Sequence, residues 1–136
     1  MAQPNTFILP DMIPFCRAPK PVSLHYEQVA AEAKQWLSDG SHIEGPVIDN
    51  LVSWKFGLLV CTTYPGAGPT ELRACTDFLN MCFLMDDLAE DVDHHMMEAV
   101  SRSVLGSMRD PDSFKSMDMF GKMVREYAQQ TVLDGP

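Results

Sequence analysis

Apolar side chains recur at steps of three and four residues along most of this chain, a spacing that places them on one side of an α-helix. After Pro21, Ser23 is expected to cap a first helix that ends near Gly40. Its apolar series comprises Tyr26, Val29, Ala30, Ala33, Trp36 and Leu37. No stretch alternates between apolar and polar residues over a useful length, as a half-buried strand would. The sequence therefore predicts an all-α fold.

Proline and glycine divide the rest of the chain into further helices. Gly45 and Pro46 are expected to open a second helix, which the segment YPGAGP at residues 64–69 ends. Its apolar side would comprise Val47, Leu51, Trp54, Leu58 and either Cys61 or Thr62. A fourth helix is predicted over residues 94–109, before Pro111, and a fifth over residues 114–132. Residues 1–21 carry repeated prolines and are expected to form an extended strap across the helices of residues 22–136.

The third helix, which begins at Thr70 and Glu71, leads into an acidic segment. One of its faces would carry Leu72, Cys75, Leu79, Cys82, Phe83 and Asp86, so we expect it to pack in the interior. The segment CFLMDDLAEDVD, residues 82–93, then contains five acids and no basic residue. Carboxylates crowded in this way repel one another unless water or a bound cation screens them. The cluster therefore predicts either a cation site or a solvated helix end.

Spacing within the acidic segment suits a hard cation. Asp86 and Glu90 are four residues apart, as are Asp87 and Asp91, so each pair lies on one helical face about a turn apart. Mg²⁺ is commonly held by one or two protein carboxylates together with water and substrate phosphate oxygens. The acids also lie at the carboxyl end of the helix, where the helix dipole favours positive charge. A bound cation would offset this unfavourable placement of the carboxylates. A solvated acidic face without a ligand remains the alternative.

The composition of the chain limits the class of protein and the kinds of molecule that it is expected to bind. The 136 residues have a formal net charge of -9, which argues against nucleic acid and anionic membrane surfaces and favours cations. With 46% hydrophobic and 21% charged residues, the chain resembles one globular domain. No apolar run approaches the ~18 residues of a membrane span. The amino terminus lacks the basic start of a signal peptide, so we expect a cytoplasmic protein. The four cysteines form no CxxC pair and are expected to be free, buried thiols rather than disulfide or zinc ligands.

Three stretches of the chain carry a family resemblance: FILPDMIPF, HYEQVAAEAKQWL and KFGLLVCTTYPGAGPTELRACTDFLNMCFLMDDLAED. In order and spacing they resemble the amino-terminal half of fungal, basidiomycete-type class I sesquiterpene synthases, with the best definition over residues 7–93. The resemblance implies a class I terpenoid synthase helical bundle, of which residues 1–136 would be the amino-terminal part of a single domain. It further implies a terpene cyclase that ionises farnesyl diphosphate with Mg²⁺ and cyclises the carbocation with release of diphosphate.

Site residues follow from the same resemblance. The family's aspartate-rich DDxxD-type motif would be Asp86–Glu90, with Asp86 and Glu90 at the matched metal-binding positions, Asp87 as the middle acid and Asp91 as an alternative register. As substrate-binding residues it suggests Phe83, Phe56 and Leu79, for which core packing is the alternative and, for Phe56, the preferred one. Trp54 would lie on the other side of the second helix from Phe56 and serve packing alone. No residue is predicted to be catalytic.

The resemblance also has a limit. The family's second metal-binding motif, NDxxSxxxE, and its diphosphate-sensing arginine have no match in residues 94–136. Without the opposite wall of the cavity, water would quench a carbocation, so we expect little or no cyclase activity from the 136 residues alone. Helix faces left uncovered would favour homo-oligomers or aggregation.

Three other kinds of protein or site could account for parts of this sequence. A non-catalytic all-α binding or assembly module would use the same acids to solvate a helix end. Prenyl-chain elongation enzymes share an aspartate-rich motif but normally carry a second copy, which is not found here. His94 and Glu98 are four residues apart in DHHMME, but two ligands are too few for a zinc site, so we expect them to face solvent.

Overall fold

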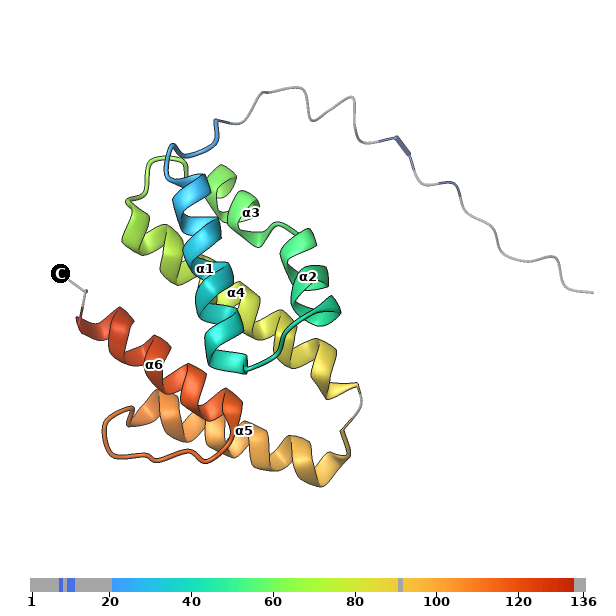
Figure 1. Cartoon of the computed structure of the whole chain (residues 1–136), viewed down its shortest axis with the longest axis vertical. Helices are drawn as coiled ribbons and strands as arrows, with labels where there is room; N and C mark the ends of the chain where they lie inside the picture. The colour runs from blue at the N-terminus through green and yellow to red at the C-terminus, as the bar shows by residue number, and fades with distance from the viewer. Residues whose placement is uncertain (1–7, 9, 12–20, 91, 134–136) are drawn as a thin grey trace, which may run out of the picture.

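The computed structural model describes residues 8, 10–11, 21–90 and 92–133, where the regular secondary structure is α-helix alone (Figure 1). The six helices are α1 (Tyr26–Ser41), α2 (Pro46–Ser53), α3 (Phe56–Thr63), α4 (Pro69–Ala89), α5 (His94–Arg109) and α6 (Met119–Leu133). The all-α prediction is confirmed for these residues. The strap expected over residues 1–21 lies almost wholly outside the described ranges. Across the described helices, no segment has the length and apolar character needed to span a membrane.

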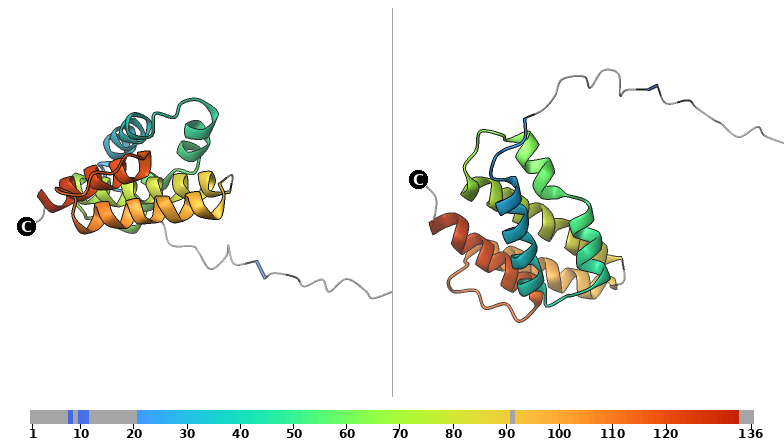
Figure 2. Two further views of the ribbon diagram at one scale, coloured as in Figure 1. Left: turned by 90° about the horizontal axis from the view of Figure 1, so that it is seen from below. Right: turned by 45° about the horizontal axis from the view of Figure 1, so that its top comes forward.

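Helix α4 is the element around which the others are arranged. It contacts α1, α2, α3 and α6, while α1 also touches α2, α3 and α6 (Figure 1). Figure 2 shows α1 and α2 lying over the level of α4, α5 and α6. Helix α5 packs chiefly on α6, so that it joins the bundle through that helix.

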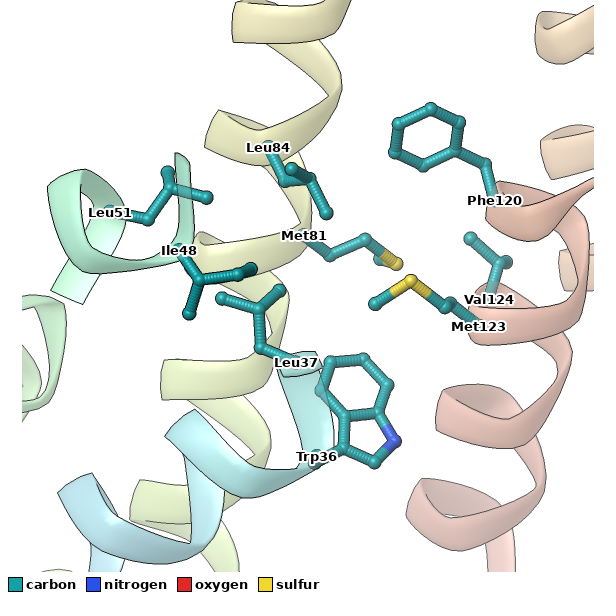
Figure 3. Packing of buried hydrophobic residues seen from close by; sticks show 9 residues of the cluster. All are labelled: Trp36, Leu37, Ile48, Leu51, Met81, Leu84, Phe120, Met123 and Val124. Carbon is teal, nitrogen blue, oxygen red and sulfur yellow. The ribbon is translucent and has the colours of Figure 1, made fainter. Parts of the chain in front are cut away.

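The hydrophobic core consists of two clusters. The larger one joins α1, α2, α4 and α6 (Figure 3): it comprises Trp36, Leu37, Ile48, Leu51, Met81, Leu84, Phe120, Met123 and Val124. The smaller one joins α1, α3 and the start of α4 through Val29, Val60, Cys61 and Leu72. Burial of this apolar surface is the main force holding the helices together. The periodic residues predicted for α1 account for its side of both clusters.

The predicted second helix is wrong, because the structure breaks it at Trp54 and Lys55. Lys55 adopts φ 56° and ψ 45°, in the left-handed region, and separates α2 from α3. Helix α2 buries Ile48 and Leu51, whereas the buried residues of α3 are Phe56, Gly57, Val60 and Cys61. On one continuous helix, at ~100° per residue, the second group would lie roughly half a turn away from the first. The break allows both groups to face the core.

The buried face of α4 is also rotated from the predicted one. The helix buries Leu72, Thr76, Asp77, Asn80, Met81 and Leu84. Cys75 and Phe83 are exposed instead, and the two faces lie roughly 120° apart around the helix. Close packing explains the difference: a Cβ atom on Gly57 would lie 3.4 Å from Ala30 Cβ and 3.7 Å from Thr76 Cγ2. Three residues of the buried face, Thr76, Asp77 and Asn80, are polar, so hydrophobicity alone does not reveal this face.

The remaining boundaries depend on polar side chains. Helix α5 has the predicted bounds, and Asp93 caps it by accepting a hydrogen bond from the Met96 amide at 2.8 Å. Helix α6 begins at Met119 rather than at residue 114, because Asp118 Oδ1 accepts from the Gly121 amide at 2.8 Å. At the first helix, Ser23 Oγ accepts a hydrogen bond from the His25 amide, and α1 starts at Tyr26. The N-cap residue of α1 is His25, so the prediction that Ser23 caps this helix is wrong.

A buried serine pair fixes the loop that precedes α6. Ser103 of α5 and Ser116 of the loop share a hydrogen bond of 2.5 Å, and Ser116 Oγ also donates to Asp118 Oδ2 at 2.8 Å. Burial alone would raise the pKa of Asp118, but hydrogen bonds from Ser103, the Gly121 amide and Ser116 lower it below its ordinary value. Residues 110–118 therefore fold back along α5 and place the start of α6 beside the middle of α5.

Candidate active site

The carboxyl-terminal turn of α4 carries the predicted metal-binding acids. The helix continues to Ala89, and Glu90, its C-cap residue, keeps helical torsion angles of φ -64° and ψ -27°. Asp86 and Glu90 are exposed and Asp87 is half-buried. Asp91 lies outside the described residues. The helix thus keeps Asp86 and Glu90 about one turn apart on one face.

These acids have no cationic partner in the described part of the chain. The ion pairs found there involve other residues, and the last turn of α4 contains no basic side chain. Within the same residues no group of three histidine, cysteine or acidic side chains is close enough to hold a metal. The available donors are exposed carboxylate oxygens without competing cations, the donor type that Mg²⁺ prefers. The magnesium site stays a prediction, and the residues present fit such an ion.

Three aromatic rings meet about one turn before the acids. Phe56 and Phe83 are stacked, with ring centroids 4.4 Å apart and an interplanar angle of 26°. Trp54 contacts both rings edge-on, at centroid distances of 5.8 Å and 5.7 Å. Phe56 is only 8% exposed, whereas Phe83 is 38% and Trp54 41% exposed. This aromatic cluster of Trp54, Phe56 and Phe83 therefore has a buried base and an open rim.

The structure brings Trp54 into contact with Phe56 and Phe83, two of the three residues predicted to bind substrate. On an unbroken helix Trp54 and Phe56 would point about 160° apart, since two residues advance the helix by ~200°. The left-handed Lys55 between them removes this separation. A lysine gives little warning of such a conformation, because glycine and asparagine are the residues that favour it. The prediction that Trp54 lies on the opposite side from Phe56 is wrong for this reason.

Leu79, predicted as part of the cavity wall, is half-buried and packs against the smaller core cluster. A small cavity of about 80 Å³ is lined by Phe56 and by residues of α1, α2 and α4, among them Ala33, Leu51 and Asn80. A larger cavity of about 560 Å³ lies near the amino-terminal end of α4. Neither is lined by Asp86, Asp87 or Glu90. The acids and the aromatic rim stand at an open surface.

Other candidate ligands are accounted for by ordinary contacts. Cys61, Cys75 and Cys82 are free thiols, as predicted for these three, although Cys75 is exposed rather than buried. Burial raises the pKa of the Cys61 and Cys82 thiols and so disfavours the reactive thiolate. Glu98 Oε1 lies 2.8 Å from Arg102 Nη2, and His94 is exposed. The solvent-facing interpretation of His94 and Glu98 is confirmed.

Sequence reasoning missed a charged contact between α1 and α4. Arg73 Nε donates to Asp77 Oδ1 at 2.8 Å, and Arg73 Nη1 lies 3.2 Å from Glu32 Oε2. Burial raises the pKa of Asp77 to about 6, although the hydrogen bond and the charge of Arg73 act in the opposite direction. The spacing of four between Arg73 and Asp77 was a visible signal for their pair. We call Glu32, Arg73 and Asp77 the ion triad.

The amino-acid sequence of the chain is similar to those of several fungal enzymes. No protein-family model matches the chain. Sesquiterpene synthase Agr1 of Cyclocybe aegerita is 32% identical over 126 residues, which is 93% of this chain and 36% of the relative. Sesquiterpene synthase 1 of Postia placenta is 28% identical over 91% of this chain and 36% of its own length. A Delta(6)-protoilludene synthase of Stereum hirsutum is 22% identical over 94% of this chain and 37% of its own length.

The match covers nearly all of this chain but a limited part of each relative. The chain spans about a third of the length of the curated relatives it matches. The share is 36% both for Agr1 and for sesquiterpene synthase 1 of Postia placenta. Its helical fold is the one that the resemblance implied. The family resemblance seen in three stretches of the sequence is thereby confirmed. The chain is a relative of the fungal sesquiterpene synthases.

Proposed function

We propose that this chain provides the acidic and aromatic part of a sesquiterpene cyclase site that acts on farnesyl diphosphate. One observation carries the proposal: on α4, carboxylates that meet no cationic partner among the described residues follow the open rim of the aromatic cluster by about one turn. Several relatives are named as sesquiterpene synthases, which supports this class of reaction. The proposed substrate has the two parts that such a surface could accommodate, a diphosphate and an apolar chain.

The acids and the rings would act on different parts of that substrate. Asp86 and Glu90, with Asp87 beside them, would hold Mg²⁺, because carboxylates alone would repel a diphosphate. When bound, Mg²⁺ supplies positive charge that stabilises the diphosphate as the allylic carbon–oxygen bond breaks. The faces of Phe83 and Trp54 would stabilise the carbocation left behind, and the buried Phe56 would hold both rings in place. The rings would also exclude water from that side of the cation.

The test uses the coupling between magnesium and diphosphate. The melting temperature of the 136-residue chain would be measured with MgCl₂, with inorganic diphosphate and with both. A ligand that binds the folded state alone raises the melting temperature, so a joint site predicts a rise with both that exceeds the sum of the separate rises. In Asp86→Asn this excess should be lost.

Asp39→Asn is the matched control, because Asp39 is an exposed aspartate of α1 and the asparagine oxygen can still accept the hydrogen bond from Gln35. Its coupling should equal that of the parent. Equal coupling in the Asp86→Asn variant would refute the magnesium role of this helix end. A non-catalytic assembly module, the alternative, would show no coupling in any of the three proteins.

A further inference from the structure

A second site is suggested by the larger cavity, at the opposite end of α4 from the acids. It has a volume of about 560 Å³ and lies between α1, the first turns of α4 and the last turns of α6. This volume is within the usual range of sites for small molecules, ~300–1,000 Å³. Along α4, Glu71 of the cavity and Asp86 are 15 positions apart in the sequence, which corresponds to ~22 Å at 1.5 Å per residue. The cavity is thus separate from the proposed diphosphate site.

The ion triad forms one wall of this cavity. Among the described lining residues Arg73 is the only one with a positive charge, and that charge already meets two carboxylates, Asp77 and Glu32. Asp77 is 2% exposed, so this wall holds a buried charged group in a fixed position. Glu32 is held from its other side as well, because its Oε1 accepts from Gln28 Nε2 at 2.9 Å. The triad carries a net negative charge before any other lining residue is considered.

Glu71 adds a further carboxylate to the lining. Within the described residues it makes no ion pair and no side-chain hydrogen bond, and it is exposed. The three acids Glu32, Glu71 and Asp77 exceed the single Arg73 by two charges, so the cavity would repel an anion such as diphosphate. The half-buried ring of Tyr127 lines the cavity from α6 and offers an aromatic face.

We propose that this cavity binds a small organic ammonium ion with an apolar body. The ammonium group would pair with Glu71 and lie near the outer edge of the triad, where its charge balances the excess of carboxylates. The apolar body would lie against the ring of Tyr127 and the side chains of Ala74 and Pro69. An aromatic face and a carboxylate together discriminate an ammonium ion from a neutral molecule of equal shape.

The experiment compares 3-phenylpropylamine with its neutral counterpart 3-phenylpropan-1-ol. Both are titrated into the ¹⁵N-labelled 136-residue chain at pH 7 and 150 mM NaCl, which screens the long-range effect of the net charge of -9. The amine should shift the amide signals of residues 70–77 and 127–131 and bind at least fivefold more tightly than the alcohol. In Glu71→Gln the affinity for the amine should fall about fivefold, as for loss of one partly exposed ion pair.

Glu44→Gln is the matched control, because Glu44 is an exposed glutamate outside the cavity lining and its replacement changes the net charge equally. It should bind the amine as the parent does. The proposal is overturned if the amine and the alcohol bind equally, if Glu44→Gln weakens binding as much as Glu71→Gln, or if the shifted amides lie elsewhere. Each of these results is independent of magnesium and diphosphate, so it leaves the proposed cyclase role unaffected.

Discussion

Asp77 is the residue whose charge should be seen in the pH dependence of stability. Its pKa is about 6 in the folded chain, whereas an unfolded aspartate has a pKa of ~3.9. The folded state therefore holds the proton more tightly, and this contribution to stability is fully present below pH ~4 and is lost as the pH rises through about 6. The direction is the reverse of that for a salt-bridged aspartate with a lowered pKa.

The variant Asp77→Asn isolates this effect, because its amide oxygen can still accept from Arg73. The free energy of unfolding of parent and variant would be measured by urea denaturation from pH 4 to pH 7. Relative to the variant, the parent should lose up to ~3 kcal/mol over this range, which corresponds to a shift of about two pKa units. A difference that stays constant, or that grows in favour of the parent, would contradict the burial argument.

At the scale of the helices, the break between α2 and α3 depends on one residue in an unfavourable conformation. Lys55 has φ 56°, which costs roughly 1–2 kcal/mol for a residue with a Cβ atom. We expect Lys55→Gly to raise the free energy of unfolding by ~0.5–1 kcal/mol, and Lys55→Val to lower it by at least ~1 kcal/mol. Chemical denaturation of the three proteins would measure both changes.

Lys34 serves as the position for control, because it is an exposed lysine within α1. There Lys34→Gly should destabilise by ~1 kcal/mol, since glycine is unfavourable inside a helix. Opposite signs for glycine at residues 34 and 55 would establish the left-handed turn. The same sign at both would mean that α2 and α3 are one helix, as the sequence had suggested.

Some features of the helices could be predicted from the sequence, and others could not. The end of α5 was predicted because Pro111 follows it closely, and α1 was predicted because its apolar residues keep one period from Tyr26 to Leu37. The break at Lys55 was missed because neither glycine nor proline marks it. The face of α4 was missed because the polar residues Thr76, Asp77 and Asn80 lie on its buried side, which a count of apolar side chains does not detect.

At the scale of the whole molecule, the cyclase reaction is expected to require more protein than this chain. The chain matches only 36% of the length of two of its relatives. In addition, the aromatic rim of Phe83 and Trp54 faces an open surface. Incubation of the 136 residues with farnesyl diphosphate and Mg²⁺ should therefore yield no cyclic hydrocarbon above background by gas chromatography. Substantial turnover to a cyclic product would show that the open rim is sufficient.

The candidate site was predictable in part, for reasons that differ between its residues. The position of Asp86 and Glu90 at a helix end follows from helical periodicity. Phe56 and Phe83 are stacked, while their role in binding substrate stays a prediction. Trp54 was assigned to the wrong side because its position depends on the torsion angles of its neighbour. The ion triad joins residues 41 positions apart, and only the packing of α1 on α4 brings them together.

The ion triad also has a consequence for how accurately the bundle assembles. Helices α1 and α4 pack against each other, and a shift of one along the other by a turn, ~5.4 Å, would change which of their side chains meet. A move of this size would separate Glu32 from Arg73 and leave the Arg73–Asp77 pair without its third member. Misaligned arrangements are thereby penalised, so that a single arginine gives the two helices one register.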